Sequence, residues 1–131
     1  MPDVEVDLDG PLFSSLQRNA AVDAFIAEAA EDVTNQLYAN VMTNLNESIQ
    51  QPTPYYETQI DIDRNGDGGG RVHDNDIVYG PWLEGTSARN RARPGFPGYR
   101  SFGRAYDEVK GQVPRIVQAA LQRAIRRLGG G

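Results

Sequence analysis

The residues most suggestive of chemistry lie in the segment 61–67, where oxygen-bearing side chains occupy alternate positions. Its four candidate ligands are Asp61, Asp63, Asn65 and Asp67, with Gly66 at the sixth position. Alternating oxygen ligands and a glycine turn are what a calcium loop of the EF-hand type supplies. The twelfth position is Val72, however, where such a loop needs a bidentate carboxylate, and both flanks have strand patterns rather than helical ones. The segment therefore favours a solvated hairpin turn, with calcium binding as the weaker alternative.

A second possible centre is His73, the only histidine of the chain, which stands beside Asp74 and Asp76. A histidine next to carboxylates could bind a metal or act as a general base. The chain has no second histidine and no cysteine, and no Ser or Thr nucleophile motif is recognisable. We therefore predict that the protein is not an enzyme, that it has no catalytic residue and that it binds no cofactor. A polar side chain on a hairpin is the simpler interpretation.

Arginines and aromatic residues alternate in the stretch 89–104. The arginines are Arg89, Arg91, Arg93, Arg100 and Arg104, and the aromatic residues are Phe96, Tyr99 and Phe102. Such a mixture can contact phosphates and stack on bases. The chain as a whole carries a net charge of −5, however, whereas dedicated nucleic-acid binders are usually basic. Pairing of the arginines with carboxylates of a protein partner is therefore favoured over direct DNA contact.

Charge is distributed unevenly along the chain. Residues 1–50 have a net charge of −8, residues 51–88 of −5, and residues 89–131 of +8. The acidic front and the basic back could neutralise each other within one fold. They could equally pair between neighbouring copies, because a head-to-tail interface joins two different surfaces of the same protein. The sequence leaves both arrangements open.

The chain of 131 residues has the usual size of one domain. It contains no cysteine, which excludes disulfides and thiolate zinc sites. No apolar run approaches the length of a membrane helix, and the acidic first ten residues lack the pattern of a secretory signal. We therefore expect a soluble, unexported protein, with an acidic N-terminal arm over 1–12, a single domain over 13–128 and a flexible tail over 129–131.

Hydrophobic periodicity predicts an α+β fold whose first large element is a long helix. Before it, acidic and apolar residues alternate over 1–10, which is typical of a strand or of an arm that becomes ordered on a partner. A cap at Ser14 or Asn19 starts the helix, which ends near Gln50. Its apolar face consists of Val22, Ile26, Ala29, Ala30, Val33, Leu37 and Val41. Beyond Val41 the apolar positions continue through Leu45 and shift gradually around the helix. They would face either a continuation of the core or a neighbouring subunit.

The middle of the chain predicts a small antiparallel sheet. Strict alternation over 56–63 is typical of a half-buried strand, and the glycine-rich run 64–71 of a turn. Val72 and then residues 77–79 would form the returning strand of a β-hairpin, with a bulge or tight turn at 74–76.

A kinked C-terminal helix should complete the fold. Residues 85–100 are rich in glycine, proline and arginine, and we expect them to form a loop that becomes ordered on assembly. A helix starts near Ser101 and should break or kink at Gly111 and Pro114. A final helix over 115–128 has an apolar half wide enough to pack on the sheet and also to touch a neighbour.

The most specific pattern of the chain lies between residues 77 and 102. It consists of Ile77-Val78-Tyr79-Gly80-Pro81-Trp82-Leu83-Glu84-Gly85-Thr86-Ser87, then Arg89-Asn90, then Gly98-Tyr99-Arg100-Ser101-Phe102. This pattern resembles the neck or tail-completion proteins of long-tailed bacteriophages, the gp-ten-like tail-component family, and especially versions from phages of actinobacteria. The order of elements over 20–128 is similar as well. The glycine-rich insertion at 66–70 and the acidic arm depart from the family pattern, so their roles stay open.

The resemblance implies a non-catalytic virion protein that is assembled in the host cytoplasm into a ring, with six copies expected, at the phage neck. The ring would join the head-side connector or stopper protein to the tail terminator or tail tube protein, and its lumen would let genomic DNA pass. A tail terminator or a DNA-contacting ring subunit is the alternative. No membrane partner is expected. The residues expected at subunit or partner interfaces are Tyr79, Trp82, Glu84, Arg89, Arg91, Tyr99, Arg100, Arg123 and Arg126.

Within this interface, Tyr79 and Trp82 would be aromatic anchors, and Glu84 would receive an arginine. Alternatively, the two aromatic residues form only a lid over the sheet, since the single tryptophan of a small domain is usually well buried. Copies would associate through the 85–100 loop and through the basic final helix, which would face the acidic first helix of a neighbour.

Overall fold

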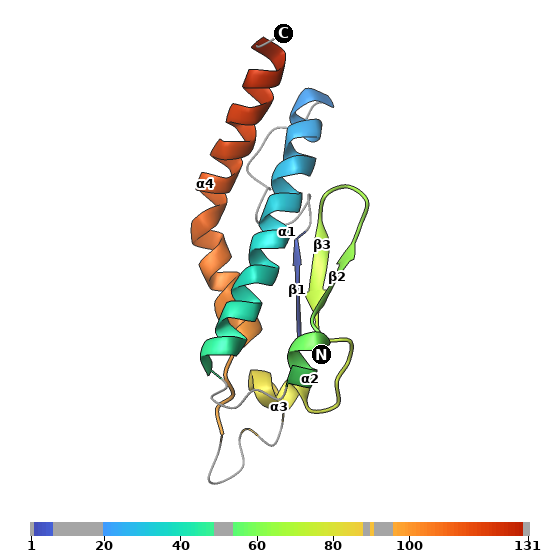
Figure 1. Ribbon diagram of the computed structural model, residues 1–131, viewed down its shortest axis with the longest axis vertical. Coiled ribbons are helices and arrows are strands. Elements are labelled where there is room, and N and C mark those ends of the chain that lie inside the picture. The colour runs from blue at the N-terminus through green and yellow to red at the C-terminus, as the bar shows by residue number, and fades with distance from the viewer. Residues whose placement is uncertain (1, 7–19, 49–53, 88–89, 91–95, 130–131) are drawn as a thin grey trace.

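A computed structural model describes residues 2–6, 20–48, 54–87, 90 and 96–129 of the chain. The protein is a mixed α+β structure, as predicted, with two long helices beside a small antiparallel sheet (Figure 1). The elements are β1 (Asp3–Val6), α1 (Ala20–Ser48), α2 (Pro54–Thr58), β2 (Asp61–Arg64), β3 (Gly70–His73), α3 (Gly80–Glu84) and α4 (Ser101–Gly129).

The sheet has three strands in the order β1-β3-β2, all antiparallel to their neighbours. Val72 in the central strand pairs with Val4 on one side and Ile62 on the other, so apolar side chains line one face. The neighbouring paired positions are charged, with Arg71 between Glu5 and Asp63, because side chains alternate between the two faces of a strand. The predicted hairpin is confirmed by β2 and β3, and the strand interpretation of the acidic arm is confirmed for residues 3–6. Residues 7–12 of that arm lie outside the described residues.

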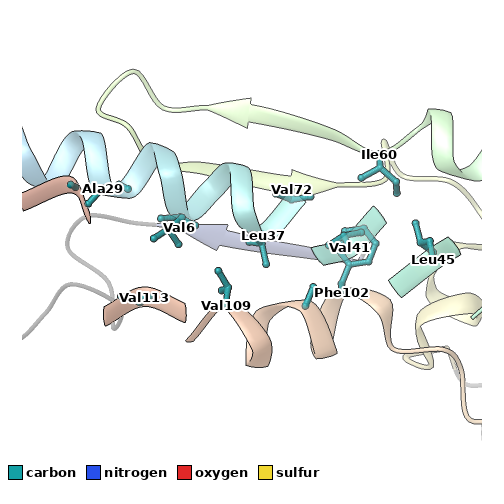
Figure 2. Close-up of a cluster of buried hydrophobic side chains, with 14 of the residues drawn as sticks. Val6, Ala29, Leu37, Val41, Leu45, Ile60, Val72, Phe102, Val109 and Val113 are labelled. Carbon is teal, nitrogen blue, oxygen red and sulfur yellow. The ribbon is translucent and has the colours of Figure 1, made fainter. Parts of the chain in front are cut away.

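The apolar face of α1 is buried as its spacing predicts. Figure 2 shows its side chains between the sheet and α4, and the buried members that the structure describes are Ile26, Ala29, Ala30, Val33, Leu37 and Val41. Leu45 is also buried, so the drift of the stripe leads to a continuation of the core. The predicted caps of this helix, Ser14 and Asn19, and its predicted last residue, Gln50, lie outside the described residues.

Two asparagines on α1 fix its position along α4. Asn40 donates through Nδ2 to Gln112 Oε1 at 2.9 Å, and Asn44 donates to the carbonyl oxygen of Ser101 at 3.2 Å and to Glu108 Oε1 at 2.8 Å. Both asparagines are buried, where a polar group without a partner would be destabilising. These bonds therefore specify one register between the two helices.

The strand predicted over 56–63 is wrong in its first half. Residues 54–58 form α2, and only residues 61–64 form a strand. Pro54 opens the helix, where the missing N–H of proline is tolerated. Tyr56 and Ile60 are both buried, and their spacing of four suits a helical turn as well as an alternating strand. The pattern of residues 56–60 is therefore compatible with a strand and with a helical turn.

The returning strand predicted through residues 77–79 is also wrong beyond its first part. β3 ends at His73, and the chain then turns at Asn75 and Asp76, which have φ angles of +56° and +59°. The side chain of Asp74 stabilises this turn by accepting a hydrogen bond from the Asp76 N–H at 3.1 Å. Val78 consequently lies at the surface rather than in the sheet.

The C-terminal helix does not break at Gly111 and Pro114. α4 is a single helix from Ser101 to Gly129 with Pro114 inside it. Pro114 is exposed, so water can satisfy the carbonyl group that loses its N–H partner there. α4 packs along α1, with Val109 and Val113 buried before the proline and Ala120 after it. This packing outweighs the local preference for a break.

None of the described helices is both long and apolar enough to cross a membrane.

Candidate assembly surface

The segment 79–87 folds into a compact corner around the short helix α3. Gly80 N–H donates to the Ile77 carbonyl oxygen at 2.9 Å and starts the helix. Gly85 ends it in the left-handed conformation with φ of +102°, and the N–H groups of Gly85 and Thr86 both donate to the Pro81 carbonyl oxygen at 2.9 Å. Glycine is required at this position because the left-handed conformation disfavours a side chain.

Glu84 caps the N-terminus of α4 rather than receiving an arginine. Its two carboxylate oxygens accept hydrogen bonds from the N–H groups of Phe102 at 2.9 Å and Gly103 at 2.8 Å, and the side chain is buried. A carboxylate at this place satisfies two N–H groups that have no partner within the helix and complements the helix dipole. Within its own chain Glu84 therefore positions α4, a role that no local pattern could indicate, since the bonded residues lie 18 and 19 positions away. Its place at a subunit interface stays a prediction.

Trp82, one of the two predicted aromatic anchors, belongs to an aromatic cluster on the same corner. The Trp82 ring lies 4.9 Å from that of Phe96, and the Phe96 ring lies 5.1 Å from that of Tyr99. All three are half-buried. Trp82 thus packs on the loop that follows α3, whereas Tyr79 lies against Tyr56 of α2 at 5.8 Å and stays 42% exposed.

The described part of the 85–100 loop is bound to α3 within one chain. Asn90 donates through Nδ2 to the carbonyl oxygens of Trp82 at 3.0 Å and Phe96 at 2.7 Å, and the Tyr99 N–H donates to the Leu83 carbonyl oxygen at 2.7 Å. Gly98 lies directly against Gly85: a Cβ atom added to Gly98 would stand 2.3 Å from the Gly85 Cα. The described residues of the loop are therefore held by contacts within the chain, and ordering on assembly stays a prediction.

The arginines of this loop are only partly described. Arg89, Arg91 and Arg93 lie outside the described residues. Arg100 is exposed with φ of +55°, and Arg104 donates through Nε to the Tyr99 carbonyl oxygen at 3.0 Å. The two described arginines thus lie where the loop enters α4.

A buried polar pair joins α2 to the turn after β3, next to the corner. The Tyr56 hydroxyl donates to Asp74 Oδ2 at 2.9 Å, and Asp74 is fully buried. Burial raises the pKa of the Asp74 carboxyl above its ordinary value, and burial together with the nearby Asp74 raises the pKa of Tyr56. Gly80 packs so closely here that an added Cβ would stand 2.0 Å from Asp74 Oδ2. The sequence interpretation missed this pair because it joins α2 to the turn after β3.

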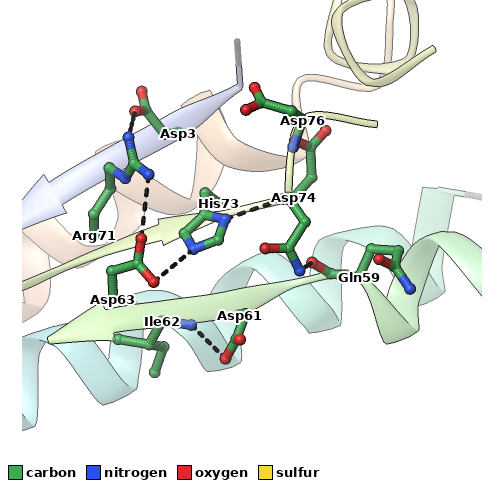
Figure 3. Close-up of polar contacts among 10 residues, drawn as sticks. Asp3, Gln59, Asp61, Ile62, Asp63, Arg71, His73, Asp74 and Asp76 are labelled. Carbon is green, nitrogen blue, oxygen red and sulfur yellow. Dashed lines mark hydrogen bonds and ion pairs between the residues drawn. The ribbon is translucent and has the colours of Figure 1, made fainter. Parts of the chain in front are cut away.

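The carboxylates of the segment 61–67, the weaker calcium candidate, have partners within the chain. Figure 3 shows Asp63 between Arg71, at 3.2 Å, and Nε2 of His73, also at 3.2 Å. The hydrogen bond from His73, assisted by Arg71, holds the pKa of Asp63 below its ordinary value. Asp61 accepts the N–H of Ile62.

Other polar side chains in and next to the hairpin also accept hydrogen bonds within the chain. Asp67 accepts the N–H of Gly69 at 2.9 Å, Asn65 is exposed in the turn, and Nδ1 of His73 accepts the Asn75 N–H at 3.0 Å. Within the ranges that the structure describes, no group of three or more His, Cys, Asp or Glu side chains could hold a metal ion. The hairpin carboxylates organise the turn and the outer face of the sheet.

The acidic front and the basic back meet within one chain along the contact between α1 and α4. Arg123 contacts Glu28 through Nε at 2.7 Å and also pairs with Asp32, while Arg127 pairs with Glu28. The hydrogen bonds from Arg127 and Arg123 lower the pKa of Glu28. Arg123, predicted at a subunit interface, is therefore engaged within its own chain, whereas Arg126 on the next turn is exposed.

Comparisons with known proteins return no relative. No protein-family model, no curated protein and no solved structure matches this chain.

Proposed function

We propose that this chain is a structural subunit that works by assembly, as one copy of a ring in the neck of a long-tailed bacteriophage. The ring joins the head-side connector or stopper protein to the tail terminator or tail tube protein and leaves a lumen for DNA. Six copies is the expected number.

This proposal rests on the roles that side chains of the segment 77–102 have in the structure. This segment is the part of the chain that resembles neck proteins. Its polar groups position backbone: Glu84 caps α4, and Asn90 holds the loop onto α3. Its aromatic residues cluster at the surface, and Tyr79 remains exposed. A rigid corner that presents aromatic side chains is suited to contact with another protein.

The size of the protein in solution tests the proposal. Native mass spectrometry and light scattering of the purified full chain should give a closed multiple of the 14.4 kDa subunit, and electron micrographs should show rings with a central hole. Because the proposal places the ring against a head-side connector, the measurement is repeated with purified connector particles. A monomer under both conditions would overturn the proposal.

A ring subunit that contacts DNA is the second candidate, and the charge of α4 favours it. From Val109 to Gly129 the helix has no acidic residue, and Arg115 and Arg126 are exposed. Phosphate contacts give an affinity for DNA that falls steeply with salt, and loss of one contact reduces the slope by about one. Arg126→Gln should lower the slope if α4 faces the lumen, with Lys110→Gln as a matched control on the same helix. A flat salt dependence favours protein contact alone.

A further inference from the structure

Large apolar side chains are exposed at only two places in the part of the chain that the structure describes. One place is the turn before α3, where Val78 is 96% exposed and Tyr79 is 42% exposed. The other is the C-terminal half of α4, where Leu121 is 38% exposed and Ile125 is 58% exposed. Exposed apolar groups that gather in this way mark interaction surfaces more often than isolated ones do.

The first place, which we call the acidic end, combines these apolar groups with carboxylates. A surface hollow of about 230 Å³ is lined by Pro2, Asp76, Ile77, Val78 and Pro81. Asp3 and Asp61 lie at the same end of the sheet, because both pair with His73, the last residue of β3. All three carboxylate residues are exposed, and Asp3 is paired with Arg71 at 3.3 Å. An apolar group inserted into the hollow would lie against Asp76, with Asp61 at the same end of the sheet.

The second place, which we call the basic end, has the opposite charge. Leu121 and Ile125 are four residues apart and therefore share one face of α4. Arg115 and Arg126 are exposed beside this face, and Arg126 also lines a hollow together with Glu28, Arg123 and Arg127. Glu108 is the last acidic residue of the chain, so α4 itself supplies no carboxylate near Leu121 and Ile125. At 3.6 residues per turn, Arg123 and Arg127, which pair with α1, lie on the side of the helix away from Leu121 and Ile125.

The two ends cannot meet within one chain. The acidic end adjoins α3, which lies at the start of α4 because Glu84 caps that helix. From Ser101 to Ile125 the helix rises by about 36 Å at 1.5 Å per residue. Figure 1 shows α3 at one extreme of the molecule and the C-terminus of α4 at the other. Each surface is therefore available only to another molecule.

We propose that the basic end of one copy docks on the acidic end of the next, with Leu121 and Ile125 packing against Val78 and Tyr79 and with Arg126 facing Asp76. This inference rests on the proposed function and specifies the joint between subunits. The partner is a second copy of this chain, because both ends expose apolar side chains and their charges are opposite. An interface between two different surfaces repeats from copy to copy and closes into a ring when the rotation per copy allows it. It replaces the predicted contact with the acidic first helix, whose carboxylates Glu28 and Asp32 already bind arginines of their own chain.

Two single variants, each altering one end, test the joint. Val78→Lys places a cation against the partner's arginines, and Ile125→Glu places a carboxylate against the partner's acidic end. Each should raise the dissociation constant between copies by about 10- to 100-fold, the effect of losing one apolar anchor. Val78 is almost fully exposed and Glu is a good helix former at an exposed position, so both variants should melt like the wild type. Thr43→Glu, at an exposed position in α1, is the matched control and should assemble normally.

Mixing the two variants gives the decisive measurement. Each copy of Val78→Lys keeps an intact basic end, and each copy of Ile125→Glu keeps an intact acidic end. Sedimentation of either variant alone should therefore show monomers, and sedimentation of the equimolar mixture should show association. Arg126→Glu, which keeps the apolar pair, should weaken assembly to a smaller degree.

The outcomes separate this inference from the proposed function. A monomeric wild type, alone and with connector particles, removes both. A wild type that assembles together with a Val78→Lys or Ile125→Glu variant that assembles equally well removes the joint and leaves the ring. Variants that are monomeric alone and stay monomeric when mixed also contradict a head-to-tail joint.

Discussion

At its N-terminal end α4 begins inside the protein, where the Glu84 carboxylate caps it and Ser101, Phe102 and Ala105 are buried. At its C-terminal end the same helix is fastened to α1 by Arg123 and Arg127 at the surface, and Ile125 faces solvent. One helix therefore has an end that is part of the folded core and an end that is held mainly by ion pairs.

The difference between the two ends shows how a small chain can be stable and still bind other molecules. Buried hydrogen bonds with charged groups contribute strongly to stability, whereas exposed ion pairs contribute little. Changes at the buried end should therefore affect folding, and changes at the exposed end should affect contacts between molecules. The predictions below test this division, beginning with the largest effect.

The close contact between Gly98 and Gly85 should be the most sensitive point of the buried end. Gly98→Ala adds a Cβ 2.3 Å from Gly85 Cα at a φ of +85°, so either the loop or α3 must move. We expect a loss of about 2 to 4 kcal/mol in the free energy of unfolding, from overpacking and from the strained backbone together. Urea denaturation of the purified variant measures it.

Gly111→Ala is the matched control for this substitution. Nothing lies within 4 Å of a Cβ added to Gly111, which is inside α4. Alanine should stabilise the helix there by about 0.5 to 1 kcal/mol. Equal losses in the two variants would contradict the account of the Gly85–Gly98 contact.

Removing the cap of α4 should have the next largest effect. Glu84→Ala leaves the N–H groups of Phe102 and Gly103 without their acceptors, and we expect a loss of about 1 to 3 kcal/mol. Glu84→Gln keeps one acceptor oxygen and should lose less. Thermal unfolding followed by circular dichroism distinguishes the two, and an alanine variant as stable as the wild type would show that the cap is dispensable.

The ion pairs of the exposed end should give the smallest effect, and one that depends on salt and pH. Arg123→Ala removes the contacts with Glu28 and Asp32, and the small loss of stability should shrink at 1 M NaCl. Because the pKa of Glu28 is lowered in the folded protein, its contribution is present above the ordinary value of 4.5 and is lost as the pH falls through the folded value. Arg126→Ala, on the next turn, should leave the pH profile unchanged, and identical profiles for both variants would refute the assignment.

The elements that could be predicted are those whose pattern is long or whose turn chemistry is distinctive. α1 carries its apolar face over several turns, and residues 65–69 of the glycine-rich run separate the two strands of the hairpin. Short segments were ambiguous: Tyr56 and Ile60 fit a strand and a helical turn equally well. Of the break or kink predicted at Pro114, the break is absent, since packing along α1 keeps α4 continuous through it.

The residues of the candidate site also fall into those that could be predicted from the sequence and those that could not. Tyr79, Trp82 and Tyr99 could be singled out because they are aromatic residues in a specific local pattern. The roles of Glu84 and Asp74 could not, because their partners Phe102, Gly103 and Tyr56 are distant in the chain.

By itself, the sequence determined the fold class, the buried face of α1 and the separation of acidic and basic segments, since periodicity and charge are properties of neighbouring residues. Only the tertiary structure decided which charges are used internally and which remain for another molecule. Arg123 found Glu28 and Asp32 because α4 runs beside α1, while Arg126 on the same helix was turned to solvent. The physical reason is that an ion pair or a cap depends on distance in space, and this distance is fixed only when the helices and the sheet pack together.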